Sequence, residues 1–181
     1  FPSFMVIDPK TDQVVARWLG SGTTEEMIRF FKNASSNPKG VFEKGQIALS
    51  VQDYKNALKY FLESLKTTKN QRKRTRILSG YIEATRKTDN AKCATDGVKY
   101  IDQVDDTAQG LDFVMMVSYC AESLKEPQAM RAVLQRVKTR LEKALANPKL
   151  AVSPDDKSSV YATLISIYEQ LKEDKQAQAA I

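Results

Sequence analysis

The chain has 181 residues, of which 42% are hydrophobic and 28% are charged, an ordinary composition for a globular protein. No apolar run approaches the roughly 20 residues that cross a bilayer, so we expect no membrane span. Histidine is absent, which excludes Ser-His and Cys-His nucleophile pairs and removes the commonest metal ligand. We therefore expect no catalytic centre, metal site or cofactor in these residues.

The first segment, residues 1–35, predicts two strands and a helix. The runs FMVI and VVARWL are β-rich and enclose the turn residues DPKTDQ. Thr23 and Glu26 then have the spacing of a capping box, which opens the helix TEEMIRFFKNA. A lone hairpin is marginal in water, so this segment should fold back on later helices, pair with a second copy across its open edge, or stay partly disordered. The apolar side chains that need cover are Phe4, Val6, Val14, Trp18, Met27 and Phe31.

From Val41 onward, helical periodicity replaces the strand pattern. The run VFEKGQIALSVQDYKNALKYFLESLK predicts two helices joined at Gln52-Asp53. The second helix carries a small, a large and a small residue on one face, namely Ala57, Phe61 and Ser64. Small residues let two helices cross closely, and a neighbouring aromatic ring fills the groove beside them.

This alanine pattern recurs more weakly along the chain, at Ala94, Ala129 and Ala177. The intervals are 37, 35 and 48 residues, and the first two are close to the period of a helix-turn-helix repeat. Apolar helices precede three of the alanines, in RILSGYIEATRK, LDFVMMVSYCAESL and SVYATLISIYEQL. We predict a mainly α fold with helical repeats over residues 38–181, and an irregular helical bundle is the alternative.

The two cysteines, Cys93 and Cys120, are 27 residues apart, a spacing that fits neither a CxxC pair nor a zinc knuckle. Each lies in an apolar helical stretch. Buried, inert thiols are the favoured interpretation, because free cysteine packs as a small hydrophobe. A disulfide between them and reactive thiols are the other two interpretations, and the sequence leaves their redox state open.

The net charge is +6, and six of the cations fall between Lys66 and Arg76, in KTTKNQRKRTR. A nucleic-acid-binding patch has this appearance, and so does a solvated turn between two helices. No glycine-rich loop or aromatic platform accompanies the run. The turn is therefore favoured, and nucleic-acid binding through Lys66–Arg76 is an alternative.

The run from Val41 to Lys66 resembles a tetratricopeptide repeat. Gly45 and Ala48 fall in the first helix, and the residues that then follow in the family's order are Asp53, Tyr54, Ala57, Leu58 and Phe61. The run departs from the family pattern at Val41, Lys44 and Ala48. The last unit keeps Tyr161, Leu164 and Tyr168 in register with Ala177. The resemblance implies an α-solenoid whose concave face binds a peptide or partner domain. Tyr54, Tyr81, Tyr161 and Tyr168 are candidate partner contacts.

The opening stretch resembles the C-terminal half of a thioredoxin fold of the disulfide-isomerase-like kind. Phe1-Pro2-Ser3-Phe4 matches the cis-proline element, FMVID and VVARWLG match two strands, Gly20 matches the glycine, and TTEEMIRFF matches the last helix. The resemblance implies that Pro2 and Ser3 contact a substrate peptide. It also implies that the family's CxxC precedes this element, so we expect the chain to be the trailing part of a larger protein.

We accordingly expect an interaction or substrate-presenting module of a thioredoxin-like thiol-disulfide oxidoreductase or isomerase, with its partial thioredoxin-like segment at residues 1–35. A non-catalytic protein-protein interaction scaffold is the alternative. The expected partners are proteins or peptides, the missing thioredoxin half, and a second copy that pairs through the hairpin. Thioredoxin-like isomerases with helical extensions are usually exported, so the resemblance also implies an extracytoplasmic location, periplasmic or secreted.

Overall fold

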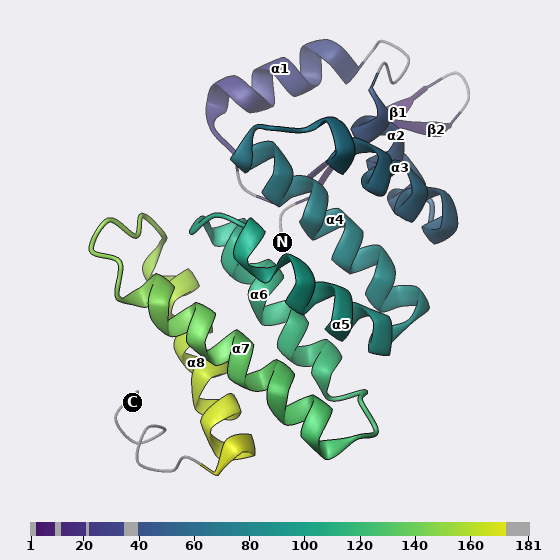
Figure 1. Ribbon diagram of the computed structural model, residues 1–181. Coiled ribbons are helices and arrows are strands. Elements are labelled where there is room, and N and C mark those ends of the chain that lie inside the picture. Colours follow the sequence, from purple (N-terminus) through teal and green to yellow (C-terminus); the bar gives the residue numbers. More distant parts are fainter. Residues whose placement is uncertain (1–2, 10–11, 21, 35–39, 173–181) are drawn as a thin grey trace.

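The computed structural model describes residues 3–9, 12–20, 22–34 and 40–172, and it shows a β-hairpin followed by a mainly helical chain (Figure 1). The strands are β1 (Ser3–Asp8) and β2 (Gln13–Leu19). The helices are α1 (Thr24–Ala34), α2 (Val41–Ser50), α3 (Tyr54–Thr67), α4 (Gln71–Thr88), α5 (Asn90–Tyr100), the 3-10 turn η1 (Ile101–Gln103), α6 (Ala108–Ala121), α7 (Pro127–Leu145) and α8 (Pro154–Leu171). The predicted mainly α fold with an N-terminal hairpin is confirmed.

The hairpin and its helix form where the sequence predicts them. Strands β1 and β2 are antiparallel, with Phe4 opposite Trp18 and an irregularity between Val6 and Ile7. The capping box at the start of α1 is present: Thr23 N–H donates to Glu26 Oε2 at 2.9 Å, and Glu26 N–H donates to Thr23 Oγ1 at 3.2 Å. The chain leaves β2 through Gly20, whose positive φ of 83° favours glycine.

From α2 to α8, each helix packs against the next one along the chain. The even-numbered helices also contact one another in order, α2 with α4, α4 with α6, and α6 with α8, while α5 contacts α7. Stacked helix pairs make neighbour contacts of this kind. The classification of these pairs as tetratricopeptide-like repeats, and the division into domains at residues 35–38, stay predictions.

Helices α2, α3 and α4 meet around the fully buried ring of Phe61. The predicted joint between α2 and α3 is confirmed, since Asp53 caps α3 by accepting a hydrogen bond from Asn56 N–H at 3.2 Å. Ala57 and Ala94 are fully buried, as a close helix crossing requires. The same expectation is wrong for Ala129, which is exposed near the start of α7. Ala177 lies outside the described residues.

One side of the hairpin docks on the helices. Trp18 is 4% exposed, and the Arg76 guanidinium of α4 lies 4.1 Å above its ring. Strand β2 packs against α2. The expected folding back is thus confirmed for Trp18. It is incomplete elsewhere, because Phe4 and Phe31 contact each other edge to face and stay 39% and 48% exposed.

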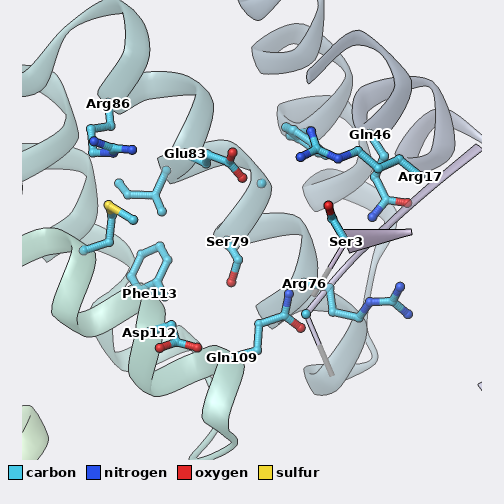
Figure 2. A pocket seen from close by; sticks show the side chains of 15 residues that line it. Ser3, Arg17, Gln46, Arg76, Ser79, Glu83, Arg86, Gln109, Asp112 and Phe113 are labelled. Atoms are coloured by element: carbon cyan, nitrogen blue, oxygen red, sulfur yellow. The ribbon is translucent and has the colours of Figure 1, made fainter. Parts of the chain in front are cut away.

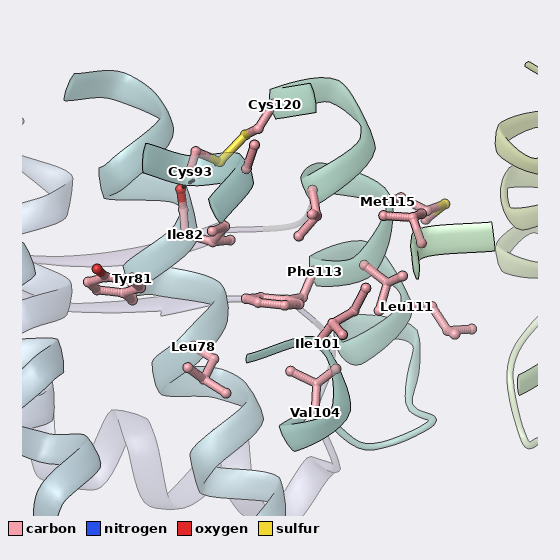
Figure 3. Packing of buried hydrophobic residues seen from close by; sticks show 14 of the residues in the cluster. Leu78, Tyr81, Ile82, Cys93, Ile101, Val104, Leu111, Phe113, Met115 and Cys120 are labelled. Atoms are coloured by element: carbon pink, nitrogen blue, oxygen red, sulfur yellow. Dashed lines mark hydrogen bonds between the residues drawn. A yellow bond between two sulfur atoms is a disulfide. The ribbon is translucent and has the colours of Figure 1, made fainter. Parts of the chain in front are cut away.

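The two cysteines form a disulfide that joins α5 to α6 (Figure 3). Cys93 and Cys120 are almost fully buried, and their Cα atoms are 5.7 Å apart. The favoured interpretation of free thiols is therefore wrong, although their predicted burial is right. Spacing alone could not decide this, because disulfide geometry depends on how α5 and α6 pack.

Among the described residues, no helix is both long and apolar enough to cross a membrane. Helix α6 is the most apolar by sequence, but it is short, and it packs against α4, α5, α7 and α8. Its side chains contribute to one core that runs through the helical part, of which Figure 3 shows Leu78, Ile82, Ile101, Leu111 and Phe113.

Candidate functional site: a groove along α4, α6 and α8

A hollow of about 260 Å³ lies where the hairpin meets the helices, and we name it the hairpin pocket (Figure 2). The hairpin contributes Ser3, Arg17 and Gly20, whereas α2 and α3 contribute Gln46 and Phe61. The remaining walls come from α4 and α6. The folding back of the hairpin therefore creates this hollow, whose lining combines apolar and charged side chains.

Three arginines line the hairpin pocket, Arg17 from β2 and both Arg76 and Arg86 from α4. Arg76 has a structural role, because its guanidinium stacks on Trp18. Burial lowers the pKa of this guanidinium. The Nε atoms of Arg17 and Arg86 are buried and have no hydrogen-bond partner. Neither of these two arginines forms an ion pair with any residue that the structure describes.

Two acidic side chains, Glu83 and Asp112, line the same pocket. In the view of Figure 2, Arg17, Glu83 and Arg86 follow one side of the pocket, and Asp112 lies on the opposite side. Burial, together with the nearby charge of Asp156, raises the pKa of Asp112 to about 6. The Asp112 carboxyl group is thus partly protonated slightly below neutral pH, which is unusual for an aspartate.

A second hollow of about 510 Å³ lies between α6 and α8, and we name it the α6–α8 pocket. Its walls include Met115, Tyr119 and Ala162. Asp112 and Met116 line both hollows. The two pockets therefore adjoin at these residues, and together they follow the even-numbered helices α4, α6 and α8. We call the combined surface the groove.

The four tyrosines predicted as partner contacts lie apart from the groove. Tyr81 is buried and its hydroxyl donates to Asp96, and burial and this bond raise its pKa. The Tyr168 hydroxyl donates to Glu142 Oε1 at 2.8 Å. Tyr54 is half-buried at the start of α3, and Tyr161 is 42% exposed on α8. None of the four lines either pocket, so their role as partner contacts stays a prediction.

The cis-proline element is described only in part. Pro2 lies outside the described residues, whereas Ser3 begins β1 and lines the hairpin pocket. The structure therefore places one of the two residues that the resemblance singled out at the candidate site. Their predicted contact with a substrate peptide stays a prediction.

The basic run from Lys66 to Arg76 spans the end of α3, a short connection and the first turns of α4. Four of its six cations have partners within the protein. Arg72 pairs with Glu26 at 3.4 Å, Arg74 donates to Gln103 Oε1 at 2.6 Å, and Arg76 stacks on Trp18. The Lys73 ammonium lies over the Phe42 ring, 6.0 Å from its centroid. The predicted turn between two helices is present, and most cations of the run contact other parts of the protein.

Sequence reasoning missed Arg17, Arg86 and Asp112. Asp112 had one local signal, since it is a lone charge in the apolar run LDFVMMV of α6. Arg17 and Arg86 had none, because 69 residues separate them and only the docking of the hairpin brings both to one pocket. The described residues contain no group of three acidic or cysteine side chains that could hold a metal ion.

Comparison of the chain with protein-family models, with curated proteins and with solved structures finds no match in any of the three. The thioredoxin-like and tetratricopeptide-like resemblances therefore stay predictions, and the groove is interpreted from its own geometry.

Proposed function

We propose that this protein is a peptide-binding or protein-binding module, and that the groove along α4, α6 and α8 holds the partner. The observation that carries the proposal is that the two pockets share Asp112 and Met116, and so form one surface over several helices. Stacked helix pairs commonly present such an extended surface to a partner.

The lining of the groove suits a polypeptide ligand. Methionine and aromatic side chains, among them Met115, Met116 and Tyr119, offer adaptable apolar contacts. Gln46, Gln109 and the charged side chains offer hydrogen bonds that can fix a ligand's orientation. A mixture of apolar walls with a few polar groups is the usual character of a binding site rather than of a packed core.

We further propose that the module presents substrates to a thioredoxin-like oxidoreductase or isomerase, with the CxxC active site supplied from outside these residues. The resemblance of the first segment supports this, and so does Ser3 at the hairpin pocket. The Cys93–Cys120 disulfide supports an extracytoplasmic location, because structural disulfides persist in oxidising compartments. Both sulfurs are buried, so they are unsuited to act as the exchanging pair.

Binding of an unfolded polypeptide tests the module. The probe is a fluorescein-labelled, carboxymethylated insulin B chain, followed by fluorescence anisotropy. Ala162 lines the groove on α8 and is exposed, so Ala162→Trp should obstruct it and weaken binding about tenfold, or about 1.4 kcal/mol. Ala132→Trp, at an exposed position of α7 that lines neither pocket, is the matched control. If the protein does not bind the probe, or if both variants bind it equally well, the proposal that the groove holds the partner is refuted.

A disulfide-reduction assay separates an enzyme module from a non-catalytic scaffold. The assay uses a protein that carries a CxxC-containing thioredoxin domain together with this module, and insulin as the substrate. Turnover that falls in the Ala162→Trp variant and is retained in the Ala132→Trp variant would support substrate presentation. Turnover no higher than the thiol background would remove the oxidoreductase proposal and leave the scaffold.

A further inference from the structure

We infer that the α6–α8 pocket selects a peptide segment that combines apolar side chains with a lysine or arginine, and that Tyr119 and Glu122 contact this cation. The inference rests on the proposed peptide-binding function and adds the chemical class of the ligand. The pocket of about 510 Å³ is lined by one stretch of α6 and one stretch of α8. This volume is typical of ligand sites.

The two walls of the pocket have the length of a short peptide. The α6 wall runs from Asp112 to Glu122, which is about 15 Å at the rise of an α-helix. The α8 wall runs from Ser159 to Gln170 and has a similar length. An extended peptide of about five residues covers the same distance. The pocket can therefore hold several consecutive side chains of a bound segment.

The charges of the pocket favour a cationic ligand. Two carboxylates line it, Asp112 near one end of the α6 wall and Glu122 at the other, and the described lining residues include no cation. The lining residues of α8 are all uncharged. This is the reverse of the whole chain, whose net charge is +6. An acidic surface attracts positively charged ligands and disfavours negatively charged ones.

The C-terminal end of α6 strengthens this attraction at Glu122. The last carbonyl groups of a helix carry partial negative charge, so a cation is favoured there. Helix α6 nevertheless has no basic residue in its last turn, and Glu122 is its C-cap. Lys125 follows α6 and Lys172 follows α8, but neither lines the pocket or forms an ion pair with Glu122. A ligand cation can thus supply the positive charge that favours this helix end.

Tyr119 gives the same cation a second contact. It lies three residues before Glu122 on α6, and side chains at this spacing are neighbours on a helix surface. One ammonium or guanidinium group can therefore lie over the Tyr119 ring and pair with the Glu122 carboxylate. Both side chains are accessible, since Tyr119 is 59% exposed and Glu122 is exposed. The apolar side chains that flank the cation can then contact Met115 and Met116 in the middle of the wall.

The test follows the ¹³C-methyl NMR signals of the methionines. Met115→Leu and Met116→Leu assign the two signals of the pocket, and Met130 of α7, which does not line it, is the internal control. The probes are acetyl-Ala-Leu-Lys-Leu-Ala-amide and its counterparts with glutamine or glutamate in place of lysine. We expect the lysine peptide to shift the Met115 and Met116 signals. It should bind about fivefold more tightly than the glutamine peptide, as an exposed ion pair and a cation–π contact together predict. The glutamate peptide should bind most weakly.

Variants of the two recognising residues give the matched comparison. Glu122→Gln and Tyr119→Leu should each reduce the preference for lysine over glutamine about two- to threefold, because each removes one of the two contacts with the cation. Glu63→Gln removes the same charge at an exposed position of α3 that lines neither pocket, and it should leave the preference unchanged. High salt should reduce the preference for lysine, since it screens exposed charges.

The inference is overturned if the three peptides bind equally well, or if the glutamate peptide binds most tightly. It is also overturned if Glu122→Gln keeps the full preference for lysine, or if no peptide shifts the Met115 and Met116 signals. The insulin B chain identifies a failure of the proposed function separately. If that chain binds and Ala162→Trp weakens its binding, the groove is preserved and only the cation subsite is removed. If that chain fails to bind as well, the proposed function is refuted together with the subsite.

Discussion

The ring of Phe61 in α3 lies against the backbone of Gly80 in α4, so close that a Cβ atom at position 80 would be 2.5 Å from the ring's Cζ. On α2, a Cβ atom at Gly45 would be 2.8 Å from Phe61 Cε1. Two glycines from α2 and α4 thus enclose one aromatic ring, and this contact sets how closely the three helices approach.

Gly80→Ala should therefore destabilise the protein, although alanine is the better helix former. The gain in helix propensity is about 1 kcal/mol, whereas overpacking a close contact typically costs about 1 to 3 kcal/mol. We expect a net loss of about 1 kcal/mol in the free energy of unfolding, measured by urea denaturation. In a Phe61→Leu background the same substitution should cost less, since the ring is gone. A Gly80→Ala protein more stable than the unchanged one would contradict the close approach.

The disulfide between α5 and α6 should contribute strongly to stability. Cys93 and Cys120 are 27 residues apart in sequence, and for a loop of this length the loss of chain entropy in the unfolded state predicts about 3.5 kcal/mol. The Cys93→Ala/Cys120→Ala double variant should thus unfold about 10 °C lower, on the usual relation between stability and Tm for this chain length. As a control on the bond itself, the native protein should show no reactive thiol before denaturation and reduction. Two titratable thiols in the unreduced, denatured protein would disprove the bond.

Trp18 reports the docking of the hairpin, because it is the sole tryptophan of the chain. Arg76→Met removes the cation above its ring but keeps most of the stem. We expect a loss of about 1 kcal/mol, the range for a partly desolvated cation–π pair. The Trp18 emission should move to longer wavelength and be quenched more by acrylamide, while far-ultraviolet circular dichroism stays unchanged. Arg136→Met, which breaks an exposed pair on α7, is the control and should leave the emission as it was.

The sequence was informative wherever structure is decided locally. Two β-rich runs around a turn sequence predicted both strands, and the spacing of Thr23 and Glu26 predicted the cap of α1. The bounds of that helix match those of TEEMIRFFKNA. The helical run from Val41 to Lys66 likewise predicted the α2–α3 joint at Gln52-Asp53, where the structure shows Asp53 capping α3. These features depend on residues a few positions apart, so one sequence suffices to find them.

The groove could not be found in the same way, because it depends on packing between distant segments. Arg17 and Arg86 share a pocket only because Trp18 docks the hairpin against α4. The candidate tyrosines show the same limit of sequence reasoning: Tyr81 and Tyr168 are buried and hydrogen-bonded, which their spacing did not predict. Their role as partner contacts stays a prediction. The spacing of aromatic residues shows which face of a helix they occupy. It does not show whether that face packs in the core or faces solvent.

Asp112 gives stability a dependence on pH that can be measured directly. Its pKa is about 6 in the folded protein, raised by burial and by the charge of Asp156, whereas an unfolded aspartate has a pKa of about 3.9. The folded state therefore binds the proton more tightly. The contribution of the protonated Asp112 carboxyl to the free energy of unfolding is fully present below about pH 4. This contribution is lost as the pH rises through about 6.

Replacing Asp112 with asparagine removes that loss. Asp112→Asn should therefore stabilise the protein at pH 7 by about 1 to 2 kcal/mol, after the full shift is reduced for solvent screening of a half-buried group. At pH 4 the two proteins should have nearly equal stability, because the Asp112 carboxyl is then largely neutral. Urea denaturation at the two pH values gives the comparison, with Asp155→Asn at an exposed site of α8 as the control. An Asp112→Asn gain that is the same at pH 4 and pH 7 would show that packing, and not the buried charge, is responsible.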